Sequence, residues 1–298
     1  MAKSSTRSSP AKSRRRLRPA RPRPERAQPI VVVGRGRVGR SLWAALRAAH
    51  EVATLVPGQV DFAEPAGGGL VFLAVPDAAI PDVAARIARL RPSERVGFVH
   101  CSGALGLGAL DALKANPIGS FHPLQSFPEP RPPEAFRGIT VAVDASTPAL
   151  LRRLNGLARG LGARPRRVRD GERALYHAAA VFASNYVIAS VGEGVRLLRA
   201  AGWSRADAEK ALLPLVEGVV ANLQRRGITR SLTGPIRRGD VDTVRRHLEV
   251  VEDPDLYRML GAVALEIARE AGLDPAAAER MGRALTGSTA ATRRRRRV

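Results

Sequence analysis

Residues 30–39 read Ile30-Val31-Val32-Val33-Gly34-Arg35-Gly36-Arg37-Val38-Gly39 and are the most informative part of the chain. The apolar run has the composition of a buried strand, and residues 41–46 continue with helical character. A strand, a G-x-G-x-x-G loop and a helix in this order place a dinucleotide pyrophosphate on a helix N-terminus. Gly34 permits the tight turn, Gly36 lets the backbone approach the phosphates, and Gly39 lets the helix pack close to the strand. The alternative is a glycine turn in an α/β unit that binds no ligand.

Two neighbouring segments extend this prediction. Residues 54–58, after the second predicted strand, lack the acidic residue that holds the ribose hydroxyls of NAD. Arg35 and Arg37 are then the nearest fixed cations for a phosphate, although both could equally be solvated surface residues. We predict NADP, with NAD as the alternative. Residues 71–77 form a buried strand ending in Pro-Asp, and its carboxyl end is expected beside the cofactor, where Asp77 caps the next turn or touches substrate or ribose. The predicted cofactor-binding residues are Gly34, Arg35, Gly36, Arg37, Val38, Gly39, Val75 and Pro76.

The composition fits a globular protein with one large or two ordinary domains. The chain has 298 residues, of which 45% are apolar, and no apolar run approaches the length of a membrane span. Its only cysteine is Cys101, so the chain has no intrachain disulfide and no zinc site of cysteine ligands. We expect a reducing, cytoplasmic setting and no metal site.

The net charge of +22 comes largely from the two ends of the chain. Residues 1–28 hold ten Lys or Arg against one Glu, and residues 293–297 are all Arg. These low-complexity ends are predicted to be disordered, solvated tails. Weak, salt-sensitive binding of nucleic acid through the tails is one alternative. An organelle transit peptide at the N-terminus is another, although its prolines argue against an amphipathic helix.

The pattern of apolar segments predicts an α/β fold. Strands are expected at 30–33, 52–56, 70–75, 96–100, 118–121, 139–143 and 163–168, with helices at 38–49, 80–90, 107–114 and 148–161. Such alternation indicates a doubly wound parallel sheet with helices on both faces. Further helices are expected at 174–200, 204–225, 241–248, 254–271 and 275–285, so an all-helical C-terminal domain follows the sheet. The predicted organisation is a basic tail at 1–28, a dinucleotide-binding domain at 29–168, a helical substrate and dimerisation domain at 169–288, and a basic tail at 289–298.

Three segments supply candidate catalytic residues. Ser102 follows a predicted strand and could donate a hydrogen bond to a substrate oxygen or to the nicotinamide carboxamide. His122 lies in a polar loop stiffened by prolines and could act as a general acid, or could simply be hydrogen-bonded within that loop. In the apolar helix 174–200, which is predicted to be buried, His177, Ser184 and Asn185 lie near one face. That polar stripe faces either a site or satisfied partners in the core. Residues 231–240 are read as a polar loop.

Six segments together resemble a known family of bacterial proteins. They are residues 33–39, 73–77, 100–105, 121–127, 176–186 and 232–235. The chain is similar to proteins with an N-terminal Rossmann-like NAD(P)-binding domain and a C-terminal helical domain catalogued as a domain of unknown function. The Phe-His-Pro-Leu-Gln and Leu-Thr-Gly-Pro pieces carry the resemblance more specifically than the glycine loop does.

The resemblance extends to a wider group with 6-phosphogluconate-dehydrogenase-like C-terminal domains. This group includes pyrroline-5-carboxylate reductase, β-hydroxyacid dehydrogenases, ketopantoate reductase and deazaflavin-dependent NADP reductases. It implies hydride transfer with NAD(P), a cleft between the domains and a homodimer formed through the helical half. β-Hydroxyacid dehydrogenases carry a catalytic lysine four residues before a helix asparagine. The equivalent position here, counted from Asn185, is Val181, so their mechanism does not transfer.

The function predicted from these features is an NAD(P)-dependent oxidoreductase that transfers a hydride to or from a small carbonyl or imine compound. The predicted catalytic residues are His122, His177, Ser102 and Asn185. The alternative is a non-catalytic NADP-binding redox sensor or scaffold protein.

Overall fold

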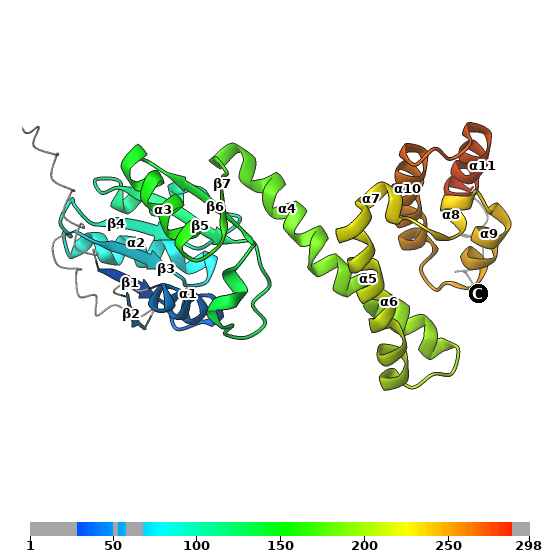
Figure 1. Ribbon diagram of the computed structural model, residues 1–298, viewed down its shortest axis with the longest axis horizontal. Helices are drawn as coiled ribbons and strands as arrows, with labels where there is room; N and C mark the ends of the chain where they lie inside the picture. The colour runs from blue at the N-terminus through cyan, green and yellow to red at the C-terminus, as the bar shows by residue number, and fades with distance from the viewer. Residues whose placement is uncertain (1–28, 50–52, 58–67, 288–298) are drawn as a thin grey trace, which may run out of the picture. The chain divides into compact units, whose positions relative to one another are not determined.

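The computed structural model describes residues 29–49, 53–57 and 68–287. Its first part contains a seven-stranded sheet with the strand order β2-β1-β3-β4-β5-β6-β7 (Figure 1). The strands are β1 (Ile30–Val33), β2 (Ala53–Val56), β3 (Leu70–Leu73), β4 (Gly97–His100), β5 (Ile118–Pro123), β6 (Thr140–Ala145) and β7 (Arg164–Arg167). All neighbouring strands are parallel except β5 and β6. The predicted fold class, a doubly wound and mostly parallel sheet followed by helices, is confirmed.

Helices cover both faces of the sheet because side chains alternate along each strand. On β1, Ile30 and Val32 join the apolar cluster beneath α1 (Arg37–Ala48) and α3 (Pro148–Gly160). Val31 and Val33 join the opposite cluster beneath α2 (Ile80–Arg89) and the 3₁₀ helix η2 (Leu107–Leu113). Short 3₁₀ helices also occur at η1 (Asp77–Ala79), η3 (Pro133–Phe136) and η4 (Asp170–Glu172). The two-sided burial explains why β1 reads as a continuous apolar run.

The chain divides into two compact units at the junction between Ser184 and Asn185. The first unit ends with α4 (Arg173–Ala183). The second is helical throughout its described residues, and its elements are α5 (Asn185–Ala200), α6 (Arg205–Arg226), α7 (Ile228–Ser231), α8 (Gly234–Arg238), α9 (Val241–Val250), α10 (Pro254–Glu270) and α11 (Pro275–Thr286). Side chains of α9, α10 and α11, among them Val244, Leu265 and Met281, form its core. Ser204 and Asp240 cap α6 and α9, and each accepts a hydrogen bond from a backbone amide of the helix that follows.

Three expectations about the second half were wrong in detail. The stretch 174–200 is two helices, which meet at Ser184, and most of it is exposed: Leu175 is 80% exposed and Ile188 72%. Its apolar composition predicted burial, but within its own unit α5 packs mainly on α6. Residues 231–240 are not a simple loop, since they contain the end of α7 and all of α8.

One stretch is long and apolar enough to cross a membrane by length and composition alone. It is Asp170–Ala200, with a mean hydropathy of 1.3, and it corrects the expectation that no run approaches a membrane span. The helices within it contain 11 and 16 residues, each shorter than the roughly 20 that a span requires. Arg173, at its start, is buried in the α/β unit. These features make the stretch weak support for a membrane span. The predicted tails and His50 lie outside the described residues.

Candidate functional site

The glycine loop has the shape that its sequence predicts. Gly34 adopts φ +114°, and a β-carbon there would lie 2.4 Å from the carbonyl oxygen of Ala74. At Gly39 a β-carbon would lie 1.9 Å from the carbonyl oxygen of Gly34, so only glycine allows α1 to approach β1 and β3 so closely. These contacts bring the end of β3, including Val75, directly against the loop.

Gly36 has a different surrounding. A β-carbon there would meet nothing within 4 Å, so the space above the backbone of this residue is open. Gly36 is also the N-cap of α1, and no side chain caps the helix. An uncapped helix N-terminus beside open space presents backbone amides and a partial positive charge to an anion. Arg35 and Arg37 flank this opening and are exposed. The loop therefore fits the pyrophosphate of a dinucleotide.

Ser102 and Asp77 form a pair where β3 and β4 end. The Ser102 hydroxyl donates to Asp77 Oδ2 over 2.6 Å, and its oxygen accepts from the amides of Ala104 and Leu105 at 3.2 and 3.1 Å. Asp77 lies in the first turn of η1, whose N-cap is Pro76, and holds this serine rather than capping the turn. The Ser102 side chain is buried and already has three partners, so its predicted contact with substrate remains a prediction.

His122 is on β5 and contacts the first turns of α4. Its Nδ1 lies 2.7 Å from the Tyr176 hydroxyl, with the two rings edge to face at 5.6 Å. On its other side the imidazole packs over Gly103, where a β-carbon would lie 2.8 Å from Nε2. The predicted candidate His177 adjoins Tyr176 on α4 and interacts electrostatically with His122. The structure thus brings His122 and His177 to the carboxyl edge of the sheet, near Ser102.

Arg173 fixes α4 to this edge of the sheet. Its side chain is buried, and its guanidinium donates to the carbonyls of Ser102 and Val168, both at 3.4 Å, and to the Ser120 hydroxyl. Nε lies 3.7 Å from a carboxylate oxygen of Asp170, which is half-exposed and also accepts from the Leu107 amide at 3.1 Å. One arginine therefore links α4 to the ends of β4, β5 and β7.

The electrostatics of the site keep its imidazoles neutral. Burial, followed by electrostatic repulsion from His177 and Arg173, lowers the pKa of His122 to about 4, against a smaller opposing effect from Asp77. Burial and Arg173 also lower the pKa of His100 to about 4, and Nδ1 of this histidine is buried without a hydrogen-bond partner. Burial raises the pKa of Tyr176 to about 12, partly offset by Arg173. At neutral pH both imidazoles are uncharged and the phenol carries its proton.

Sequence reasoning missed Arg173 and Tyr176. Both lie one helical turn apart on the α4 face that carries His177. The i, i+3, i+4 spacing places the three residues on one helix face, but only if the helix begins at or before Arg173, and the sequence does not define that start. Asn185 begins α5 in the second unit, so its predicted role stays a prediction.

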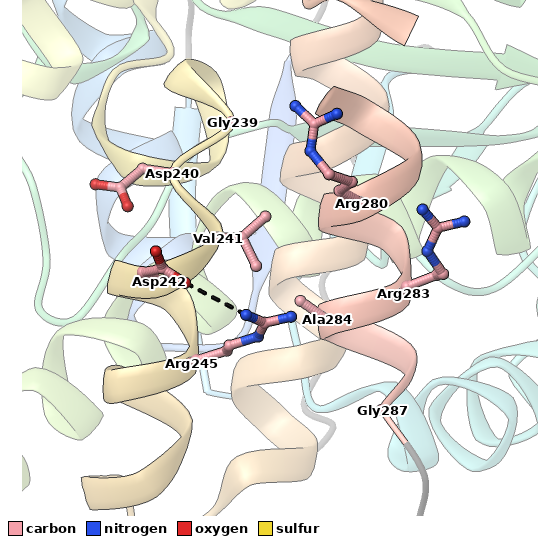
Figure 2. A pocket seen from close by; sticks show the side chains of 9 residues that line it. All are labelled: Gly239, Asp240, Val241, Asp242, Arg245, Arg280, Arg283, Ala284 and Gly287. Carbon is pink, nitrogen blue, oxygen red and sulfur yellow. Dashed lines mark hydrogen bonds and ion pairs between the residues drawn. The ribbon is translucent and has the colours of Figure 1, made fainter. Parts of the chain in front are cut away.

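Two cavities bear on the choice of site. One cavity, of about 530 Å³, is lined in part by Asp77, Leu105 and Asp170, and Asp77 is the residue that pairs with Ser102. A larger one of about 800 Å³ lies in the helical unit between α9 and α11, where Figure 2 shows three arginines around it. Two of these arginines are paired with neighbouring acids, Arg245 with Asp242 and Arg283 with Glu279. None of the predicted catalytic or cofactor-binding residues lines either cavity, but Asp77, which holds Ser102, lines the smaller one, so the sheet edge is the better candidate. Across the described residues, no group of three or more His, Cys, Asp or Glu could hold a metal ion.

Residues 139–266 match a family model described as a domain of unknown function, DUF2520. The match runs from β6 to α10 and so spans both units. Among curated proteins, none matches this chain in sequence.

The fold is shared with solved structures, some of which are named as NADP enzymes. Protein TM1727 from Thermotoga maritima is 24% identical with a TM-score of 0.65, over 81% of this chain and 98% of that one. BF3122 from Bacteroides fragilis, provisionally named an NADP oxidoreductase, is 21% identical with a TM-score of 0.63, over 82% and 97%. Pyrroline carboxylate reductase from Plasmodium falciparum, solved with NADP bound, is 13% identical with a TM-score of 0.53, over 86% and 99%. These likenesses define the class of fold: a Rossmann-type sheet followed by a helical region.

Proposed function

We propose that this chain is an NAD(P)-dependent oxidoreductase that transfers a hydride to or from a small carbonyl or imine compound. The observation that carries the proposal is the glycine loop: Gly34 and Gly39 are fixed by close contacts, while Gly36 opens an uncapped helix terminus. A nicotinamide dinucleotide bound there would supply the hydride. The reductases that share the fold support the same chemistry.

The residues at the sheet edge divide the remaining work. His122 provides a polar N–H or lone pair for the substrate heteroatom, and His177 lies next to its partner Tyr176. Ser102 and Asp77 hold the turn after β4 in place. Asn185, the first residue of α5, would orient substrate. Fixed orientation and polarisation of the acceptor would supply most of the rate acceleration.

Replacement of the two histidines tests this assignment. His122→Ala or His177→Ala should lower turnover by about a hundredfold, the usual contribution of a positioned acid or base. Turnover of NADPH against a carbonyl and imine panel is the measurement, and NADPH affinity should stay unchanged. Unaltered turnover in both variants would remove them from the mechanism.

A second candidate function is a non-catalytic NADP-binding sensor or scaffold. The observation that favours it is the absence, at Val181, of the lysine that β-hydroxyacid dehydrogenases use. NADPH binding without oxidation by any member of the panel would support this reading.

A cytoplasmic location and a homodimer formed by the helical unit remain proposals. The single buried cysteine supports the first, and the exposed apolar side chains of α5 and α6 support the second.

A further inference from the structure

We propose that His122 and Tyr176 form a two-residue proton relay, in which neutral His122 donates from Nε2 and Tyr176 resupplies the proton through Nδ1. The relay rests on the proposed function and names the groups that handle the proton in it. It assigns a role to Tyr176, which the residue pattern did not single out.

The geometry fixes one end of the relay and leaves the other open. Nδ1 of His122 faces the Tyr176 hydroxyl at 2.7 Å, a short hydrogen bond. Nε2 hydrogen-bonds to none of the described residues. Unlike His100 Nδ1 and His177 Nδ1, which are fully buried and have no partner, this nitrogen is not fully buried. Gly103 packs against the ring, and a β-carbon there would lie 2.8 Å from Nε2, so only glycine leaves this nitrogen room. The free nitrogen can therefore reach a ligand.

The charges around the pair allow the phenol to donate to Nδ1, the direction that the relay assigns to this hydrogen bond. Tyr176, His177 and Arg173 face His122 from α4, and Asp77 faces it from η1. These surroundings keep the imidazole uncharged and the phenol protonated at neutral pH. A protonated phenol that donates to Nδ1 leaves the ring proton on Nε2, which is the tautomer that the relay needs.

The proton step balances without an imidazolium ion. As the substrate carbon gains the hydride, the π-electron pair of its C=O or C=N bond moves to the heteroatom. That heteroatom takes the proton from Nε2 while Nδ1 takes the hydroxyl proton of Tyr176. His122 ends neutral as the Nδ1–H tautomer, and Tyr176 ends as a phenolate that Arg173 stabilises and that solvent reprotonates. The reverse sequence serves oxidation.

Arg173 is a positioning residue for this pair. It holds the first turn of α4 against Ser102, Ser120 and Val168, so Tyr176 meets His122 at a fixed distance. Its charge also favours the phenolate, because it lowers the pKa of Tyr176 against the effect of burial.

Nitrogen NMR of the full chain tests the tautomer without needing activity. His122 signals, assigned with His122→Ala, should show a neutral Nε2–H ring from pH 5 to 8, with protonation only near pH 4. Tyr176→Phe should shift these signals. Tyr257→Phe is the matched control, since Tyr257 makes the same 2.7 Å contact with His247 in the helical unit and should leave His122 unchanged. An Nδ1–H ring, or protonation near pH 6.5, would overturn the relay.

Kinetics with an accepted substrate test the use of the relay. Tyr176→Phe should reduce turnover by about a hundredfold with unchanged NADPH affinity, and adding it to His122→Ala should cost little more. Tyr257→Phe should be fully active. Wild-type turnover in Tyr176→Phe, or losses that multiply in the double variant, would contradict the relay. If bound NADPH is never oxidised by the panel, the proposed function fails, whereas the NMR result decides the tautomer separately.

Discussion

Single buried side chains set much of what this site can do. Arg173 is the clearest case, because a buried guanidinium costs free energy unless its donors are satisfied. Here its terminal nitrogens donate to three oxygen acceptors at the sheet edge, and Nε, which makes no hydrogen bond, lies 3.7 Å from the Asp170 carboxylate. His100 and His122 show the opposite response to burial, since each remains neutral instead of finding a charged partner.

Removing Arg173 should therefore destabilise the first unit. Arg173→Ala leaves its acceptors unpaired and detaches α4, and we expect a loss of about 3 kcal/mol in the free energy of unfolding. Urea unfolding at pH 7 measures it. Arg205→Ala is the control, because its pair with Glu209 is exposed and should contribute less than about 0.5 kcal/mol. Equal losses in the two variants would contradict the role of Arg173.

Acid should destabilise the fold through the same histidines. Their pKa is about 4 in the folded chain and 6.5 in the unfolded one, so the unfolded state takes up protons first as pH falls. Stability is full above pH 6.5 and is lost between pH 6.5 and 4, by roughly 3 kcal/mol for His100 alone. Urea midpoints across this range provide the test, and His122→Gln should reduce the slope. A flat profile would show that these histidines are not held neutral.

At the scale of elements, most strands could be predicted because they are short apolar runs between turn residues, whereas β7 reads Arg-Pro-Arg-Arg and is largely exposed. The glycine loop followed from residue types alone, since Gly34 and Gly39 are required by backbone contacts. The break between α4 and α5 at Ser184 could not be predicted from residue types, because the residues on both sides of it favour helix. The pairing of His122 with Tyr176 depends on where α4 begins relative to β5, which no local pattern encodes. Asp77 also looked like a turn cap, but a serine 25 residues away holds its carboxylate.

The start of α1 should determine which dinucleotide binds. If Arg35 and Arg37 contact the 2′-phosphate, replacing both with Ser should lower the affinity for NADPH by about tenfold or more and leave the affinity for NADH little changed. The reason is that one charge-assisted hydrogen bond contributes about 1.5 kcal/mol or more. Fluorescence titration with both nucleotides measures this. Arg89→Ser, at the end of α2, is a control that should alter neither affinity. An equal loss for both nucleotides would place the arginines elsewhere on the cofactor.

For the whole molecule, the notable property is the apolar surface left uncovered on the helical unit. Ile188 and Leu213 line a cavity of about 560 Å³ between α5 and α6, and they are 72% and 53% exposed. Exposed apolar surface on this scale is typical of an interface. The sequence read this stretch as buried, and a second copy of the chain would satisfy that pattern where a single chain does not.

We accordingly expect a dimer in sedimentation experiments on the full chain. Ile188→Glu combined with Leu213→Glu should yield a monomer, because each carboxylate would be buried without a partner. Val250→Glu is the control, since Val250 is 76% exposed at the end of α9 and its variant should remain dimeric. A wild-type monomer at micromolar concentration would contradict the proposed assembly.

Calorimetric titration of the full chain with NADPH and NADH tests dinucleotide binding most directly when it includes Gly36→Ala. The β-carbon in this variant meets no protein atom, so the melting temperature should match that of the wild type while nucleotide affinity falls at least tenfold. Gly156→Ala, equally unobstructed but on α3, should bind as the wild type does. We predict saturable binding of NADPH that only Gly36→Ala impairs. No heat from the wild type at millimolar nucleotide, or equal binding by Gly36→Ala, would show that this loop does not hold a dinucleotide.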